Sequence, residues 1–429
     1  MKSKFKKSEN FLSKAEKIIP LGSQTFSKSK TALPKGVSPF FAEKGKGSKF
    51  FDIDGNKFLD FVNALASVTL GYGDPDVDKA VKEQLKKGVT FSLSHPIETK
   101  LAKMITELIP CADMVRFAKN GSDATSASIR LARAYTGREH IAVCGYHGWH
   151  DWYIGSTTRD LGVTTEGKNK THKFEFNNIN SLEHLLDRKK GQFAAVIMEP
   201  MNIAWPKKGY LRKVADLAKL HGALLIFDET ITGFRFDLSG AQNYFKVTPD
   251  LATFGKGIAN GFPLSVLTGK RKYMELVEKI FFSGTFGGET ISIAAAIAVI
   301  NKYKKKNVVS KLSIQGEKII KGTNELIQKH NLSQNISITG HPSWSFINFK
   351  PYKTINSLKL KTLFLQEVFA RGIYMLGSHN LSYSHTDSDI DQLFKCYDQV
   401  FPILYDALYN DNINKKLRCK PLKPLFKVR

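Results

Sequence analysis

The sequence Ala-Leu-Leu-Ile-Phe-Asp-Glu at residues 223–229 decides the fold class. Its five apolar residues form a short continuous run, which is typical of a strand buried in a parallel sheet. Two acids, Asp228 and Glu229, follow the run directly. Downstream, Phe-Gly-Lys-Gly at residues 254–257 sets Lys256 between two glycines. The two segments predict a carboxylate and an amine, each at the end of a buried strand.

This pair of residues points to one kind of chemistry. A lysine that loses its proton condenses with an aldehyde, and a carboxylate keeps a pyridine nitrogen protonated, so that the ring accepts electrons. Together, Lys256 and Asp228 predict a site for pyridoxal 5′-phosphate. Neither feature is informative alone, because lysine is abundant in this chain and an Asp-Glu pair after a strand is more often a helix N-cap.

The phosphate of such a cofactor needs a site of its own. A glycine loop at a helix N-terminus binds phosphate through free backbone N–H groups and the helix dipole. Residues 120–124, Asn-Gly-Ser-Asp-Ala, form such a loop, because they follow the strand-like run 114–118 and open a helix-like stretch. Gly121 offers an amide, and Ser122 adds a hydroxyl. An ordinary strand-to-helix turn with a capping residue explains this segment equally well.

The cofactor ring also needs a flat partner. Tyr146, in Cys-Gly-Tyr-His-Gly-Trp-His at residues 144–150, directly follows a short predicted strand and is placed to stack on a pyridine face. The neighbouring His147, His150 and Asp151 form an alternative, metal-binding cluster. No further His or Cys at ligand spacing accompanies them, so we expect no metal site.

Five segments, in order along the chain, carry a resemblance to a known family: NGSDATSASIRLARAYTGR, GYHGWHD, LLIFDETITGFRF, FGKGIANGFPLSV and SGTFGG. Through them, about residues 15–390 resemble class III aminotransferases of fold type I, most closely the glutamate-1-semialdehyde aminomutase branch. The resemblance implies an α/β fold with a mostly parallel central sheet, helices on both faces, and a smaller α/β domain built from both chain ends. It also implies a homodimer with shared active sites.

The resemblance implies a role for each matching residue. Lys256 matches the Schiff-base lysine, and Asp228 matches the partner of the pyridine nitrogen. Thr285 matches a threonine that reaches the phosphate of the neighbouring subunit's cofactor, whereas Thr230 stands where the family usually has valine. The full cofactor-binding set is Gly121, Ser122, Tyr146, Glu199, Asp228, Thr230, Lys256 and Thr285.

Two departures argue against the aminomutase itself. Lys28 stands where that enzyme has an arginine for the substrate carboxylate, and lysine makes no bidentate fork. Residues 374–386 lack an acid before His385, where the aminomutase has a gating glutamate. We therefore expect a ping-pong aminotransferase acting between an amino donor and an oxo acid, aldehyde or ketosugar, with an aminomutase or epimerase as the alternative. The candidate substrate contacts are Lys28, Glu289 and His379.

Composition bounds the function class. The 429 residues suffice for two domains with a large core, and no run approaches the roughly 20 apolar residues of a membrane span. Four cysteines without pair spacing favour a reducing compartment, so we expect a cytoplasmic protein. The net charge of +25 raises the alternative of a non-catalytic binder of nucleic acid or another anionic polymer. Because the lysines are spread along the whole chain, we expect no nucleic-acid partner.

Three regions are predicted along the chain. Residues 1–65 hold an amphipathic helix around Phe11–Ile19 and a hairpin, and they join the small domain. In residues 66–305, short β-rich runs alternate with helical patterns, as in a large cofactor-binding domain. Residues 306–429 form the rest of the small domain and end in a basic, proline-containing tail from Lys415, which we expect to be partly ordered.

Overall fold

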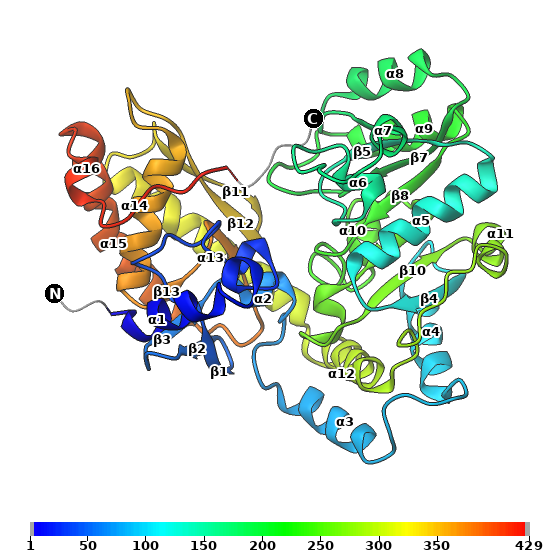
Figure 1. Cartoon of the computed structure of the whole chain (residues 1–429), viewed down its shortest axis with the longest axis horizontal. Helices are drawn as coiled ribbons and strands as arrows, with labels where there is room; N and C mark the ends of the chain where they lie inside the picture. The colour runs from blue at the N-terminus through cyan, green and yellow to red at the C-terminus, as the bar shows by residue number, and fades with distance from the viewer. Residues whose placement is uncertain (1–3, 425–429) are drawn as a thin grey trace. The chain divides into compact units, whose positions relative to one another are not determined.

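The computed structural model describes residues 4–424, which divide into two compact units (Figure 1). The larger unit takes residues 66–68 and 75–309. The smaller unit combines the N-terminal part through Leu65, the segment 69–74 and the C-terminal part from Ser310. The boundary that we placed after residue 305 thus falls at residue 309. Among the described residues, no helix is both long and apolar enough to cross a membrane.

A seven-stranded sheet organises the larger unit, in the order β4-β10-β9-β8-β7-β5-β6. Its strands are β4 (Met114–Ala118), β5 (His140–Cys144), β6 (Thr171–Lys173), β7 (Phe193–Met198), β8 (Leu224–Asp228), β9 (Leu251–Phe254) and β10 (Ser265–Gly269). The strands β6, β5, β7, β8 and β9 are parallel, and β10 is antiparallel to both of its neighbours. The predicted mostly parallel sheet is therefore confirmed.

The helices of this unit pack on the sheet or on one another (Figure 1). They are α3 (Pro75–Leu85), α4 (Pro96–Leu108), α5 (Gly121–Thr136), α6 (Asp151–Ile154), α7 (Thr165–Asn169), α8 (Ile179–Arg188), α9 (Tyr210–Leu220), α10 (Gly240–Tyr244), α11 (Arg271–Met274) and α12 (Thr290–Lys306). Helix α5 packs against β7, β9 and β10, whereas α8 and α9 pack against β5 and β8 respectively.

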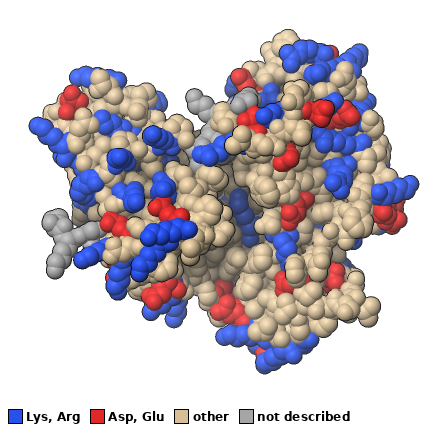
Figure 2. Space-filling view, viewed as in Figure 1, with Lys and Arg blue, Asp and Glu red and all other residues tan. Residues whose placement is uncertain are grey.

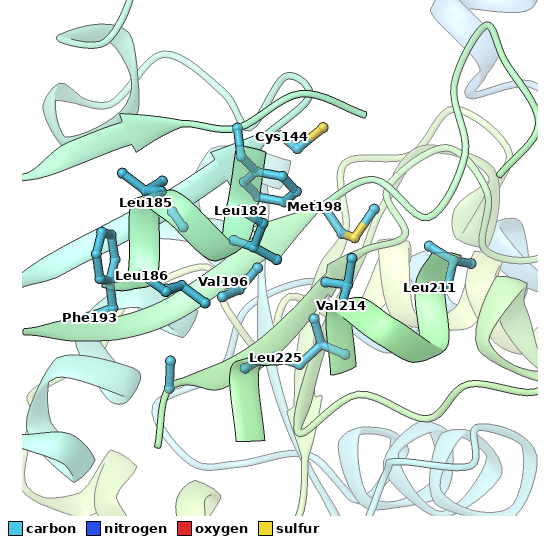
Figure 3. Close-up of a cluster of buried hydrophobic side chains, with 14 of the residues drawn as sticks. Cys144, Leu182, Leu185, Leu186, Phe193, Val196, Met198, Leu211, Val214 and Leu225 are labelled. Atoms are coloured by element: carbon cyan, nitrogen blue, oxygen red, sulfur yellow. The ribbon is translucent and has the colours of Figure 1, made fainter. Parts of the chain in front are cut away.

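Strand β7 shows why the central strands read as continuous apolar runs. Its alternate residues Val196 and Met198 belong to the core cluster shared with α8 and α9 (Figure 3). Its other residues, Ala195 and Ile197, belong to a second cluster shared with α5. Because successive side chains point to opposite faces of a sheet, a strand covered on both faces must be apolar at every position.

Smaller sheets and long helices make up the other unit. Its strands are ordered β1-β2-β3-β13 and β11-β12-β14. Their bounds are β1 (Ala42–Lys46), β2 (Lys49–Asp52), β3 (Lys57–Asp60), β11 (Ile336–His341), β12 (Trp344–Phe349), β13 (Ile373–Tyr374) and β14 (Ser378–Asn380). The helices are α1 (Lys6–Ala15), α13 (Val308–Lys329), α14 (Ser357–Ala370), α15 (Asp387–Tyr409) and α16 (Ile413–Lys416), and the short turn α2 (Asn63–Ala66) lies at the boundary of the units.

The N-terminal helix is shorter than the apolar repeat predicts. Helix α1 ends at Ala15, and Ile18 is 83% exposed. Pro20 prevents the helix from continuing through Ile19, because a proline disfavours helical backbone at the residue before it, and Ile19 is extended with φ −126° and ψ 119°. The prediction of a helix through Ile19 is therefore wrong in its last turn.

The basic tail follows the surface of α14 as far as the structure describes it. The Arg418 amide donates to Gln366 Oε1 at 2.7 Å, and the Leu422 amide donates to Thr362 Oγ1 at 3.0 Å. The Arg418 guanidinium also lies 3.2 Å from a Glu367 carboxylate oxygen. Lys and Arg side chains are spread over both units, among acidic ones (Figure 2).

Candidate active site

The predicted cofactor residues of the larger unit come from one edge of its sheet. Asp228 is the last residue of β8, Glu199 follows β7, and the loop with Tyr146 follows β5. Lys256 comes two residues after β9. Since these strands are parallel and in register, their carboxyl ends meet at one edge, where ligands of open α/β sheets bind.

Asp228 is a buried carboxylate with a full set of hydrogen bonds. Its Oδ2 lies 2.9 Å from His147 Nδ1. Its Oδ1 accepts from the Thr230 hydroxyl at 2.6 Å, the Thr230 amide at 3.1 Å and the Thr253 hydroxyl at 3.2 Å. Burial works to raise the pKa of Asp228, but the bonds from His147 and Thr230 outweigh burial and lower the pKa below its usual value.

His147 is the functional residue that the sequence pattern left unassigned. Both of its ring nitrogens lie against oxygen atoms. Nδ1 lies next to Asp228 Oδ2, and Nε2 lies 3.2 Å from the Cys144 carbonyl oxygen. The ring is buried and lies parallel to the Trp152 indole at 6.3 Å. His150 bonds Ser126 instead, so the neighbouring histidines have separate partners. No cluster of three or more metal-binding side chains occurs in residues 4–424.

Lys256 supplies the amine of the site. Within the described part of the chain, its Nζ makes no hydrogen bond or ion pair. Burial lowers the pKa of Lys256, and the carboxylates of Asp228 and Glu199 oppose this shift without reversing it. Its backbone is left-handed, with φ 44°, a conformation that non-glycine residues rarely adopt and that costs on the order of 1–3 kcal/mol.

The N-terminus of α5 offers an anion site. This 16-residue helix begins at Gly121. In the described structure the backbone N–H groups of Gly121 and Ser122 have no acceptor, whereas those of Lys119 and Asn120 are bonded by the Asp123 carboxylate. Free amides, the helix dipole and the Ser122 hydroxyl together suit a phosphate group.

Two glycines let the loop after β5 approach its neighbours. At Gly148, with φ 102°, a Cβ atom would collide with Ser122 Oγ, and at Gly145, with φ 111°, a Cβ would collide with Glu199 Oε2. Glu199 in turn accepts hydrogen bonds from the Tyr146 amide at 3.0 Å and the Asn202 side chain at 2.9 Å. Glu199 thus holds the loop that presents Tyr146.

Tyr146 and Thr230 are the two predicted contacts of the cofactor ring. Tyr146 is 49% exposed and rests edge-to-face on Tyr153, with ring centroids 5.6 Å apart. The Thr230 side chain lies between the backbones of two glycines, since a Cβ at Gly121 would come 3.2 Å from its Cγ2 and one at Gly255 would come 3.4 Å from it. The donors, the acceptor and the aromatic face therefore fit a phosphorylated pyridine aldehyde.

Thr285 and Glu289 lie on the segment before α12. Thr285 is exposed, in a loop with the exposed side chain of Phe286. Glu289 instead caps α12, accepting from the Ile291 amide at 2.6 Å and the Ser292 hydroxyl at 2.7 Å, and it forms an ion pair with Lys119 at 2.9 Å. These contacts occupy the carboxylate, so the geometry does not support Glu289 as a substrate contact.

Lys28 and His379 belong to the smaller unit. Lys28 lines a cavity of about 200 Å³ together with the buried Asp60, which accepts a hydrogen bond from Tyr72 at 2.6 Å. His379 is fully buried, and its ring nitrogens bond the hydroxyls of Ser345 and Tyr397. Burial lowers the pKa of His379 to about 3. His379 is a neutral core residue, so this geometry gives no support to the prediction that it contacts substrate.

Comparison with known proteins gives the family. The family model for aminotransferase class-III matches residues 32–396. A 3-aminobutyryl-CoA aminotransferase from Cloacimonas acidaminovorans is 36% identical, over 91% of this chain and 95% of that protein. A glutamate-1-semialdehyde 2,1-aminomutase from Methanosarcina acetivorans is 32% identical, over 89% of this chain and 99% of its own length.

A solved structure extends the likeness to the whole fold. The FumI protein of a Sphingopyxis species, in its PLP internal aldimine form, superposes with a TM-score of 0.87 at 26% identity, covering 97% of this chain and 99% of that one. The predicted fold class, enzyme class and pyridoxal phosphate cofactor are thereby confirmed. The chain belongs to the class III aminotransferases.

Proposed function

We propose that this protein is an intermolecular aminotransferase that works by a ping-pong mechanism, with Lys256 and Asp228 as its catalytic residues. The observation that carries the assignment is their placement at one sheet edge, where Asp228 is buried and hydrogen-bonded and the Lys256 amine has no partner among residues 4–424. Pyridoxal phosphate supplies an aldehyde that takes up the amino group and a ring that accepts the electron pair of the substrate carbon.

The chain's own residues then divide the work. Burial favours the neutral form of the Lys256 amine, which suits this amine for carrying a proton to and from the substrate carbon. The Asp228 carboxylate, held ionised by His147 and Thr230, keeps a proton on the ring nitrogen. The α5 N-terminus binds the phosphate, and Tyr146 covers one face of the ring.

Two observations favour an aminotransferase, which moves the amino group from one molecule to another, over an aminomutase, which returns it to the same carbon skeleton. The Cloacimonas relative, named as an aminotransferase, is 36% identical, and the Methanosarcina aminomutase is 32% identical. Lys28 replaces the arginine expected of an aminomutase, and the carboxylate of Asp60 lines the same cavity. Lysine cannot make the bidentate fork by which arginine holds a carboxylate, such as that of glutamate 1-semialdehyde.

A screen of amino donors and carbonyl acceptors tests this proposal. The donors include glutamate, alanine and 3-aminobutyryl-CoA, and the acceptors include oxo acids, aldehydes and ketosugars. A transaminase given a donor without an acceptor accumulates the amine form of the cofactor, which is seen as a loss of the aldehyde-form absorbance. This absorbance recovers when an acceptor is added. The aminomutase would be supported instead if the protein converted glutamate 1-semialdehyde without net consumption of a donor and reacted with none of the donor–acceptor pairs.

The proposal includes a cytoplasmic homodimer with shared active sites. Support comes from Thr285, which stands exposed next to Phe286, itself 59% exposed. Free cysteines, of which Cys111, Cys144 and Cys396 are buried, fit a reducing compartment.

Mixing two inactive variants tests the shared sites. A Lys256→Ala chain and a chain with a bulky acid at Thr285 should complement, because each mixed dimer regains one intact site. The control is a Lys256→Ala chain mixed with itself after the same exchange treatment, which should regain no activity. No recovery despite demonstrated subunit exchange, or an active monomer in sedimentation, would contradict the shared-site proposal.

A further inference from the structure

Asp228 is bonded unevenly at its two carboxylate oxygens. Oδ2 faces His147, and Oδ1 accepts three hydrogen bonds, two of them from Thr230. The Thr230 hydroxyl contact, at 2.6 Å, is the shortest of the four. Hydrogen bonds to ionised acceptors are short and roughly twice as strong as those between neutral groups. Thr230 therefore makes the closest contact with the carboxylate.

The local chain geometry makes this contact specific for a hydroxyl. Thr230 lies two residues after Asp228, so its amide and its hydroxyl both turn back to the same oxygen. Its methyl group meanwhile faces the positions of Gly121 and Gly255. A valine at this position would keep the methyl contacts and the β-branched shape but would lose the hydroxyl donor.

We propose that Thr230 is a positioning residue for Asp228: its hydroxyl keeps the carboxylate ionised and its plane fixed, so that the proton of the cofactor's ring nitrogen stays on the ring. This inference rests on the proposed role of Asp228 and deepens it. It also gives the departure from valine at this position a chemical consequence.

The surroundings of Asp228 explain why a further donor matters. Burial disfavours the charged carboxylate, and Glu199 adds a like charge nearby. Lys256 lies within electrostatic reach and is itself shifted toward its neutral form. When hydrogen bonds to the charged form are removed, a buried carboxylate takes up a proton more readily. The titratable groups that face Asp228 are Tyr146, His147, Tyr153, Glu199 and Lys256.

The test compares Thr230→Val, which keeps the shape, with Thr230→Ser, which keeps the hydroxyl. The first readout is the proton resonance of His147 Nδ1–H in the apoprotein, assigned by its absence from a His147→Gln spectrum. Without the Thr230 hydroxyl, Asp228 is more basic and forms a stronger hydrogen bond with the His147 Nδ1–H proton. The resonance of this proton should therefore move downfield in the Val variant and stay in place in the Ser variant. Equal resonances in the wild type and the Val variant would overturn the proposal. If the Val variant does not fold, Thr230→Ala is the second variant that lacks a hydroxyl.

The second readout is the ¹⁵N chemical shift of the ring nitrogen in bound, labelled cofactor. The Val variant should shift toward the unprotonated value and lose kcat by roughly tenfold, the equivalent of about 1.4 kcal/mol, with KM changed less than twofold. The Ser variant should keep the wild-type shift. A ring signal that does not respond to Asp228→Asn would refute the role of Asp228 itself, whereas a normal response to Asp228→Asn with no response to Thr230→Val would refute only the role of Thr230.

Discussion

Replacing Gly148 with alanine should weaken cofactor binding through a steric effect on the phosphate site. Gly148 has φ 102°, and an added Cβ would collide with the Ser122 hydroxyl. The Trp149 amide bonds the same hydroxyl at 3.3 Å, so the loop cannot retreat without breaking this contact. Ser122 is buried at the start of α5, and the added methyl group must displace the residue that lies at the proposed phosphate site.

The size of the effect follows from the contacts at stake. A hydrogen bond to a charged group contributes about 1.5–3 kcal/mol, so losing the Ser122 hydroxyl contact alone should weaken cofactor binding by roughly 10- to 150-fold. The backbone strain of alanine at a positive φ adds a stability cost on the order of 1–3 kcal/mol. Cofactor affinity is measured by titrating the apoprotein and following cofactor absorbance or tryptophan fluorescence.

Gly137 provides the matched control at the other end of the same helix. It is the C-cap of α5, with φ 66°, and an added Cβ would meet no atom within 4 Å. Gly137→Ala should therefore lower stability through backbone strain, by about 1 kcal/mol, and leave cofactor affinity unchanged. Wild-type affinity in Gly148→Ala, or equal losses of affinity in both variants, would refute the steric argument.

Three further predictions follow from the same geometry. Lys256→Ala should still bind cofactor through its phosphate but lose the borohydride-trappable link and nearly all turnover; covalent trapping at another lysine would contradict this role. Asp228→Asn should keep the fold and lower kcat by several orders of magnitude, because the ring accepts electrons poorly without its carboxylate; near-normal turnover would reject the assignment. Burial lowers the pKa of His379 to about 3 and that of His385 to about 4, so only the unfolded chain takes up protons as pH falls from about 6.5 toward 4. Each histidine should then lower the free energy of unfolding by roughly 2 kcal/mol at pH 5 relative to pH 7, and an unchanged denaturation midpoint between these pH values would contradict this.

The fold was predictable because its central strands carry a strong local signal. Strands covered on both faces are continuous apolar runs, and the run predicted at 223–227 coincides with β8 to within one residue. The N-terminal helix was predicted too long because its apolar repeat continues to Ile19, past the last helical residue, Ala15. Amphipathic spacing reports which face of a helix is apolar, and it says little about where the helix stops.

The site was less predictable because its contacts join residues far apart in the chain. Sequence position placed Asp228, Glu199 and Lys256 at strand ends, but the bond from His147 to Asp228 spans 81 residues. The available signal was the position of His147, directly after the tyrosine and in the loop that follows β5, which β7 separates from β8. Without the distance to Asp228, the same histidine reads equally well as one member of a metal cluster with His150.

Polar residues in the small unit show most clearly that a single sequence does not reveal which polar side chains are free to contact a ligand. His379 stands in the sequence Gly-Ser-His-Asn at residues 377–380, which is typical of a loop at a binding site. Yet β14 turns its ring into the core, where Ser345 and Tyr397 satisfy both nitrogens. A neutral histidine is a small aromatic with two polar atoms, so two hydroxyl partners suffice to make it a core residue. Whether a polar side chain is free for a ligand is decided by the partners that folding brings to it, and Lys256, whose amine meets none among residues 4–424, differs from His379 in that respect.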